Sequence, residues 1–438
     1  MPDARVSFPR LEPRSLPGPD TIRREELANG LVVLARENFS SPSVVLSGYL
    51  LAGGLHEPEA QSGLANLTAS SLMRGTRRRS FQQIYESIES IGASLSFSAG
   101  KHTTSFQGKS LAEDLEHVLG ILAEALGQPS FPAREVERVR GEKLTSLAIR
   151  DQDTGAVAGL EFDRLAYAGH PYSLPAEGMP ETVSRLKAGD AGAFHRRMYG
   201  PRGMVIAVVG AVRRRAAVEA VEAALGGWSN PTQPGEPELP PLRPLAGMAR
   251  QDRTLAGKSQ CDVVLGVPGP SRFDPDYLAA AVGNNILGRF GMYGRIGDAV
   301  REDAGLAYYA YSALTGGPGP GPWSVLAGVN PTNVDRAINL IRKEIRRFVG
   351  RQVSAAELRE NQANFIGRLP LQLESNEGVA GALVNMERYH LGLDYYVRYA
   401  ERISAVTRDD VLRTARRFLS PDRLAIAVAG PPLKGAGG

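Results

Sequence analysis

Two side chains in the second half of the chain, Arg301 and Tyr308, have the types and spacing to stabilise negative charge on an oxygen atom. Arginine carries a permanent positive charge, and tyrosine supplies a phenolic hydrogen-bond donor. Donors placed around a developing oxyanion lower the barrier to reactions such as peptide hydrolysis. The two residues taken alone allow another interpretation, in which Arg301 ends a surface helix and Tyr308 packs in a strand beside Tyr309 and Tyr311.

The other residues that carry chemistry form no recognised catalytic pattern. No two histidines are four residues apart, the spacing that would place a pair of metal ligands on one helix face. We therefore expect surface or internally bonded roles for His56, His102, His117, His170, His195 and His390. No Ser-His-Asp arrangement or nucleophile elbow is present, which removes support for serine-hydrolase chemistry. The glycines from Gly288 to Gly294 lack the pattern of a phosphate-binding loop.

A segment in the first half has the frame of a metal-binding helix without the ligands. Residues 63–76 read GLANLTASSLMRGT, with Gly-Leu-Ala at one end and Gly-Thr at the other. This segment resembles the active-site helix of the M16 (pitrilysin-like) metallopeptidases, which reads GLAH-x-x-EH and ends in a Gly-Thr dipeptide. Asn66, Ala69 and Ser70 stand at the positions of the family's His, Glu and His.

The resemblance implies that this chain alone holds no catalytic zinc. Zinc needs imidazole, thiolate or carboxylate donors, and hydrolysis needs a general base beside the metal-bound water. An amide, a methyl group and a hydroxyl at Asn66, Ala69 and Ser70 supply neither. The family's third ligand is a Glu on a later helix, in a pattern like ERxxxLxE, and Ser146 occupies that position here, with Val139 at an accessory acidic position.

A segment of the second half resembles the partner half-site of the same family. Residues 294–308 read GRIGDAVREDAGLAY and are similar to the family's SRLFQxVREKxGLAY, in which an Arg and a Tyr seven residues apart reach across the chamber to the zinc site of the other half. Arg301 and Tyr308 match both types and the spacing. The resemblance therefore implies that they act in trans, at the zinc site of a partner.

Two weaker resemblances concern substrate binding. Residues 92–99 are similar to the family's edge strand, which pairs with a peptide by β-augmentation, and here the strand is either substrate-binding or structural. The residues concerned are Ser96, Phe97, Ser98 and Ala99. The Gly288 to Gly294 segment stands where processing-peptidase α subunits carry a longer glycine-rich loop, and it is shorter and poorer in glycine here.

The chain repeats one plan at an offset of 220 positions. Residues 190–210 contain Arg-Arg, a proline and the strand-like 205–208 ending at Gly210, and residues 410–430 repeat this order. Between the repeats, residues 226–247 are rich in Pro and Gly and cannot continue a helix or a central strand. We predict an N-terminal arm (1–20), a first domain (21–225), a semi-rigid linker (226–247), a second domain (248–432) and a flexible tail (433–438).

Apolar periodicity switches between two and about 3.6 within each domain, which is typical of an α+β fold. Residues 31–35, 44–52 and a hairpin at 93–108 follow the strand pattern. A helical stripe begins at Leu111 and continues to Leu126, and residues 278–287 and 334–349 repeat this pattern. We expect two homologous α/β-roll domains, each a mostly antiparallel sheet with helices on one face, in the LuxS/MPP-like metallohydrolase architecture that the resemblance implies.

Composition and charge are those of an ordinary globular protein. The chain of 438 residues is 42% hydrophobic and 22% charged, with a formal net charge of +4 and scattered arginines, so no nucleic-acid surface is predicted. The single cysteine, Cys261, excludes an internal disulfide. No signal peptide and no apolar run of membrane-spanning length is seen, and a cytoplasmic location is expected by default.

The sequence thus predicts the zinc-less subunit of a heterodimeric M16 peptidase, inactive alone, whose partner carries zinc on an intact H-x-x-E-H helix. The expected substrates are unfolded peptides enclosed between the two arms of a clamshell. Two alternatives remain: a structural or assembly subunit, since core proteins of respiratory complex III resemble M16 members, and a homodimeric peptide-binding protein without metal. No cofactor is expected in this chain itself.

Overall fold

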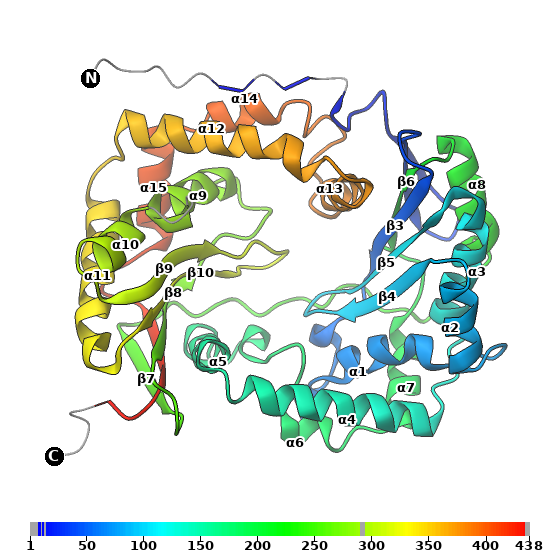
Figure 1. Cartoon of the computed structure of the whole chain (residues 1–438), viewed down its shortest axis with the longest axis horizontal. Helices are drawn as coiled ribbons and strands as arrows, with labels where there is room; N and C mark the ends of the chain where they lie inside the picture. Colours follow the sequence, from blue (N-terminus) through cyan, green and yellow to red (C-terminus); the bar gives the residue numbers. More distant parts are fainter. Residues whose placement is uncertain (1–7, 10, 13–14, 290–293, 434–438) are drawn as a thin grey trace.

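The computed structural model describes residues 8–9, 11–12, 15–289 and 294–433. Figure 1 shows two β-sheets on opposite sides of the molecule, each covered by helices. The fold is α+β, as the sequence predicts. Residues 290–293 of the 288–294 segment fall outside the described residues, as do half of the N-terminal arm and nearly all of the tail.

The first sheet has six strands in the order β1-β2-β6-β3-β5-β4. Its strands are β1 (Arg23–Glu26), β2 (Val32–Glu37), β3 (Ser43–Leu50), β4 (Ser94–Ala99), β5 (Thr104–Leu111) and β6 (Val205–Gly210). Only β2 and β6 pair in parallel, and the other neighbours are antiparallel. Strand β4 is therefore an edge strand.

The second sheet repeats this plan with five strands in the order β7-β11-β8-β10-β9. Its strands are β7 (Ala249–Thr254), β8 (Cys261–Pro268), β9 (Ala307–Leu314), β10 (Pro322–Val329) and β11 (Ala425–Gly430). Strand β11 is parallel to β7 and antiparallel to β8, as β6 is to β2 and β3. Strands β6 and β11 start at residues 205 and 425, the offset seen in the sequence. Strand β9 occupies the edge that corresponds to β4.

The first half contributes eight described α-helices. They are α1 (Leu64–Ser71), α2 (Phe81–Glu89), α3 (Leu115–Gly127), α4 (Ala133–Arg150), α5 (Thr154–Ala166), α6 (Pro180–Val183), α7 (Ala188–Met198) and α8 (Arg214–Leu225). One of these, α5, packs on the second sheet. The apolar stripe predicted from Leu111 begins only at Leu115, because Leu111 ends strand β5 and is exposed. From Leu115 to Leu126 the stripe is buried against the sheet.

The second half has seven described α-helices. They are α9 (Tyr277–Asn284), α10 (Arg295–Gly297), α11 (Val334–Gly350), α12 (Ala355–Gln372), α13 (Asn376–Arg388), α14 (Tyr399–Ser404) and α15 (Arg408–Phe418). Serine 354 and Glu357 form a capping box at the start of α12, and Thr407 and Asp410 form another at α15. These caps satisfy amide groups that a helix N-terminus leaves without partners.

The two halves exchange a helix, which the sequence analysis did not anticipate. Helix α13 of the second half lies on the face of the first sheet that its own helices leave open, against β3 and β6 (Figure 1). Alternate residues of β6 point to this face, with Val205, Ala207 and Val209 packing against Ala380 and Leu383. Polar contacts line the rim, including the bidentate pair of Arg24 with Glu387 at 2.9 and 2.8 Å and a 2.7 Å ion pair of Lys109 with Glu377.

The reciprocal contact places α5 of the first half on the second sheet, against β8 and β11. The side chains that β11 turns toward α5 are small, namely Ala425, Ala427 and Ala429, and they allow Phe162 on the helix to approach the sheet. Helices therefore cover both faces of each sheet, one face from its own half and the other from the opposite half. The sequence predicts helices on one face of each sheet. That prediction accounts for the helices from the same half, and the other face is covered by a helix of the opposite half.

The connection between the halves contains no helix or strand from residue 226 to residue 248. It is nevertheless packed, because Leu239, Leu242 and Leu245 contact the cluster formed by α5 and β11. Its start is held by Gln233, which is buried and donates to the carbonyl oxygen of Arg202 at 3.0 Å. Packing of this kind fits the predicted semi-rigid connection better than a flexible tether.

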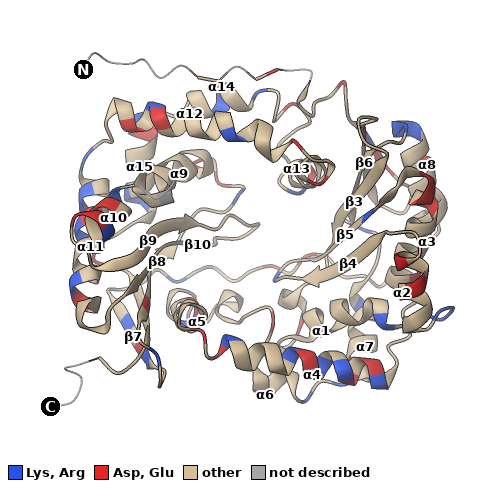
Figure 2. Ribbon diagram, viewed as in Figure 1, with Lys and Arg blue, Asp and Glu red and all other residues tan. Residues whose placement is uncertain are grey.

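Charged side chains lie mainly on the outer helices, where both signs alternate along α4 and α11 (Figure 2). Among the described helices, none is long and apolar enough to cross a membrane. Cys261 is fully buried on β8, and burial raises its pKa to about 11.

The alanines of β11 offer a test of the helix exchange. Replacing Ala427 by Leu forces extra volume between β11 and α5, so we expect the protein to lose about 1–3 kcal/mol of stability. The midpoint of thermal unfolding should fall clearly. Ala148 is exposed on α4, and Ala148→Leu is the matched control that should leave the midpoint in place. Equal midpoints for the two variants would show that α5 does not pack tightly on β11.

Candidate functional site

A lysine occupies the place where the sequence analysis looked for metal ligands. Asn66 lies on α1, and its side-chain amide donates to the carbonyl oxygen of Ala99 on β4 at 3.2 Å. The Lys143 ammonium on α4 donates to Asn66 Oδ1. Burial lowers the pKa of Lys143 to about 8, while Glu177 and Glu142 act in the opposite direction. Asn66 thus links α1, α4 and the edge strand β4.

The frame of α1 is built by a glycine and a buried carboxylate. Gly63 precedes the helix with φ of 98°, and a Cβ at this position would come within 2.9 Å of the Glu177 carbonyl oxygen. Glycine is the residue that tolerates both constraints. The Glu57 carboxylate accepts from the amides of Gly63 at 2.9 Å and Ala65 at 2.8 Å, and burial raises its pKa to about 7. A carboxylate at a helix N-terminus compensates the unpaired amides and the helix dipole.

The other positions that align with the family's zinc-site residues take no part in the hydrogen bonds between Asn66 and Lys143. Ala69 is buried in the first core, and Ser70 is half-buried on the same helix. Ser146 is exposed on α4, where its hydroxyl donates to the carbonyl oxygen of Glu142 at 3.1 Å within the helix. Val139 is buried in the first core. Positions 139, 143 and 146 lie on one face of α4, because their spacing is four and then three residues.

These residues do not fit a zinc ion. The donors present are an amide and two hydroxyl groups, none of which is a usual zinc ligand. The Asn66 oxygen is bonded to an ammonium group, whose positive charge would repel a second cation. Within the described part of the chain, no group of three or more His, Cys, Asp or Glu side chains could hold a metal ion.

Arg301 and Tyr308 flank the entry to the edge strand β9. Arg301 lies in the short helical segment Asp298–Glu302, with its Nε 3.6 Å from a carboxylate oxygen of Glu302 and about one third of its side chain exposed. Gly305 ends this segment with φ of 62°, and the Leu306 amide donates to the Val300 carbonyl oxygen at 3.0 Å. A glycine in this conformation is a common helix stop.

Tyr308 follows as the second residue of β9 and is 70% exposed, whereas the next residue, Tyr309, points inward and donates to Asp262. Tyr311 is 41% exposed farther along the strand. Tyr308 therefore lies in the strand beside Tyr309, as the alternative interpretation expects, but its side chain is largely exposed to solvent. The phenol is available to a molecule outside this chain.

The predicted substrate-binding residues lie on the edge strand β4. Ser96 and Ser98 are exposed, Phe97 is half-buried against the first core, and Ala99 is buried at the end of the strand. The strand pairs with β5 on one side only. An edge strand with small exposed side chains can accept a further strand.

Lys143 is the site residue that sequence reasoning missed. The signal was present, since Lys143 is four residues after Val139 and three before Ser146, both of which the analysis singled out. The search there was for carboxylates, and a lysine on the same helix face was passed over. Its contact with Asn66 depends on the packing of α1 against α4, which the sequence does not reveal.

Comparisons with known proteins agree with this architecture. The family model "Insulinase (Peptidase family M16)" matches residues 32–174, and "Peptidase M16 inactive domain" matches residues 185–365. Both models describe parts of one family, and together they cover most of the chain. The protein belongs to the peptidase M16 family.

Individual relatives span nearly the whole chain. An uncharacterized zinc protease of Streptomyces coelicolor is 28% identical over 420 residues, covering 94% of this chain and 90% of that protein. The crystal structure of a peptidase M16 inactive domain from Pseudomonas fluorescens is 27% identical, with a TM-score of 0.85 over 94% of this chain and 98% of that one. Mitochondrial cytochrome b-c1 complex subunit 1 of Bos taurus is 27% identical over 268 residues, covering 60% of this chain and 55% of that protein.

The buried ammonium of Lys143 predicts a pH dependence of stability. An unperturbed lysine has a pKa of about 10.4, so between about pH 8 and 10.4 the unfolded chain binds the proton that the folded chain has released. The free energy of unfolding should therefore rise with pH in this window, by at most about 1.4 kcal/mol per pH unit from this group. Replacing Lys143 by Met should remove that part of the rise.

The measurement is chemical denaturation of the wild type and the variant at several pH values from 7 to 10.5. Lys187 is exposed, and Lys187→Met serves as the control that should keep the wild-type slope. A Lys143→Met variant with the same pH slope as the control would mean that Lys143 stays solvated.

Proposed function

We propose that this chain is the zinc-less subunit of a heterodimeric M16 peptidase, closing a chamber around an unfolded peptide and supplying Arg301 and Tyr308 to the partner's zinc site. The observation that carries the proposal is an asymmetry between the halves. The first half replaces the metal position by Asn66 and Lys143, while the second keeps an arginine and an exposed tyrosine at the family spacing.

The chemistry assigned to the pair follows from its charges and exposure. Attack on a peptide carbonyl builds negative charge on its oxygen, and a guanidinium group together with a phenol can stabilise that charge. Tyr308 lies on an edge strand and faces away from the core of its own chain. A second subunit would have to present its metal and the substrate to this side of the sheet. The zinc and the general base would then come from the partner.

Peptidase activity and metal content, measured on the same samples, test the proposal directly. The chain would be purified alone and after co-expression with an H-x-x-E-H homologue from the same organism, then assayed with a quenched unstructured peptide. We expect the isolated chain to be inactive and zinc-free, and the pair to show chelator-sensitive activity. Stoichiometric zinc and activity in the isolated chain would contradict the assignment of Asn66, Ala69, Ser70 and Ser146 as lost ligand positions.

Variants of the pair separate a catalytic contribution from assembly. Arg301→Ala should lower the turnover of the assembled peptidase by about 100-fold, and Tyr308→Phe should lower it less, because one donor to the oxyanion is lost in each case. Both variants should still co-elute with the partner. Tyr311→Phe, on the same strand and also exposed, is the matched control for Tyr308. Turnover unchanged in Arg301→Ala would remove this residue from the mechanism.

A second candidate function is a structural subunit of a larger assembly without a part in catalysis. The match to a subunit of the bovine cytochrome b-c1 complex favours it, because that relative is a component of a multisubunit complex. Under this function the natural partner complex would lack peptidase activity, whereas the peptidase proposal requires activity in the complex.

A further inference from the structure

The helices of the second half enclose a cavity of about 350 Å³ that no part of the proposed peptidase function uses. Its walls come from the loop between β8 and α9, the end of β9, and helices α9, α12 and α13. Two arginines and several aromatic rings line it, including Arg272, Arg368, Tyr277, Phe365 and Tyr389. The volume is in the lower part of the range of small-molecule sites.

The two arginines are placed by stacking and not by ion pairs within the cavity. The Arg272 guanidinium lies 4.5 Å from the ring centre of Tyr277 and 4.9 Å from that of Tyr389, and the Arg368 guanidinium lies 5.2 Å from Phe365. Nε of each arginine is buried and has no hydrogen-bond partner. Among the described lining residues there is no Asp or Glu. The cavity therefore contains two positive charges and no carboxylate to balance them.

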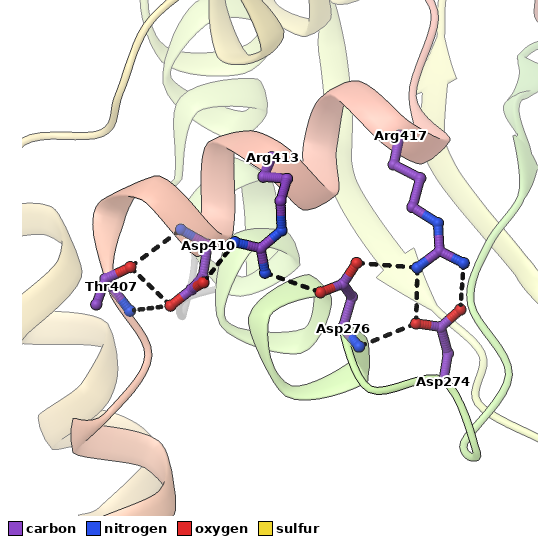
Figure 3. Close-up of polar contacts among 6 residues, drawn as sticks. All are labelled: Asp274, Asp276, Thr407, Asp410, Arg413 and Arg417. Carbon is purple, nitrogen blue, oxygen red and sulfur yellow. Dashed lines mark hydrogen bonds and ion pairs between the residues drawn. The ribbon is translucent and has the colours of Figure 1, made fainter.

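The carboxylates nearest to Arg272 in the sequence are engaged elsewhere. Asp274 and Asp276 bind Arg417, and Asp276 also binds Arg413 at 2.9 Å (Figure 3). These ion pairs fix the loop before α9 against α15, so that Arg272 is held in position while its acidic neighbours face the other helix. The backbone amide of Arg272 is fixed as well, donating to the Gly317 carbonyl oxygen at 2.8 Å.

The tyrosines of the cavity do not supply negative charge. Burial raises the pKa of Tyr396 to about 12 and raises the pKa of Tyr395 as well, so both phenols stay neutral near neutral pH. The rings of Tyr395, Tyr396 and Tyr399 lie 5.1–6.3 Å apart and form an aromatic wall. Such a wall suits an apolar or aromatic body attached to an anionic group.

One wall of the cavity also carries an unpaired acceptor. Asn361 donates to the Glu357 carbonyl oxygen at 2.8 Å, which leaves its own side-chain oxygen to accept from Asn285 at 2.6 Å. This orientation fixes the Asn285 amide nitrogen as the donor and directs its oxygen elsewhere. Asn285 is 1% exposed, and its Oδ1 has no hydrogen-bond partner. This oxygen has almost no accessible surface, so it faces packed side chains and not the space of the cavity.

Gly316 leaves room for the side chains of Arg272 and Tyr277. A Cβ at Gly316, in the connection after β9, would lie 2.3 Å from the Tyr277 hydroxyl oxygen and 2.7 Å from Arg272 Cδ. Any larger residue at this position would displace both side chains. The position of the Arg272 guanidinium over the Tyr277 ring therefore depends on the glycine at position 316 as well as on the two side chains.

We propose that this cavity binds a carboxylate that carries an apolar or aromatic body, with the carboxylate opposite Arg272 and Arg368 and the body against the tyrosines. Guanidinium groups are the usual partners of carboxylates in buried sites. The carboxyl terminus of a peptide and a small aromatic acid share this chemistry. This site does not depend on a partner subunit or on Arg301 and Tyr308.

The test is calorimetric titration of the isolated full chain with three small probes. N-acetyl-phenylalanine carries the carboxylate, the amide and the ring; its carboxamide lacks the carboxylate; 3-phenylpropionate lacks the amide. We expect both carboxylates to bind, and the carboxamide to bind at least about 10-fold more weakly than N-acetyl-phenylalanine. The comparison on the wild-type protein requires no variant to fold.

Variants then locate the binding. Arg368→Gln should weaken N-acetyl-phenylalanine by at least about 10-fold, while Arg359→Gln, an exposed position on the same helix, should leave it unchanged. Absence of binding at millimolar concentration, or equal binding to the carboxamide, would overturn the proposal. Tighter binding of N-acetyl-phenylalanine than of 3-phenylpropionate would support a peptide terminus as the source of the carboxylate, and the reverse order would support a small organic acid. Peptidase activity of the co-expressed pair is measured separately. Its absence would contradict only the function proposed for Arg301 and Tyr308, and not the binding proposed for this cavity.

Discussion

Each sheet of this protein depends on a helix donated by the opposite half. A sheet has two faces, and the helices that follow its own strands cover only one of them. The second face of the first sheet is covered by α13, and that of the second sheet by α5. Without this exchange, alternate apolar residues of β6 and β11 would be exposed to water. The halves are therefore not independent units, and the position of one edge strand relative to the other is set by two buried helix contacts.

This constraint explains why two half-sites can differ in chemistry without loss of the fold. The exchanged helices use residues such as Phe162 and Leu383, far along the chain from Asn66 or Arg301. Changes at the metal position alter only the contact between α1 and α4. There, Lys143 and Asn66 supply a positive charge and a hydrogen bond, which hold helix and edge strand together.

The sequence predicted the parts of the fold that have a short-range cause. Strand β5 alternates strictly between buried and exposed residues, and the repeat at 220 positions matches β6 and β11. The helix exchange has no short-range pattern in the sequence. The apolar face of α5 indicates that the helix packs on a sheet, but it does not indicate which of the two sheets. Lys143 was missed for the same reason. Its significance comes from burial between two helices, and a lysine in a polar helix carries no mark of that in the sequence.

The two edge strands show how one plan gives surfaces of different character. Strand β4 exposes Ser94, Ser96 and Ser98, while β9 exposes Tyr308 and Tyr311. Serines leave the backbone groups of an edge accessible, so β4 favours pairing with an extended chain through main-chain hydrogen bonds. Tyrosines project rings and hydroxyl groups beyond the edge, so β9 favours contacts made by side chains. The strands occupy equivalent positions in their sheets. They differ in their exposed side chains and in a register shift between β9 and β10 at Tyr308, so equivalent edges of one fold present different binding surfaces.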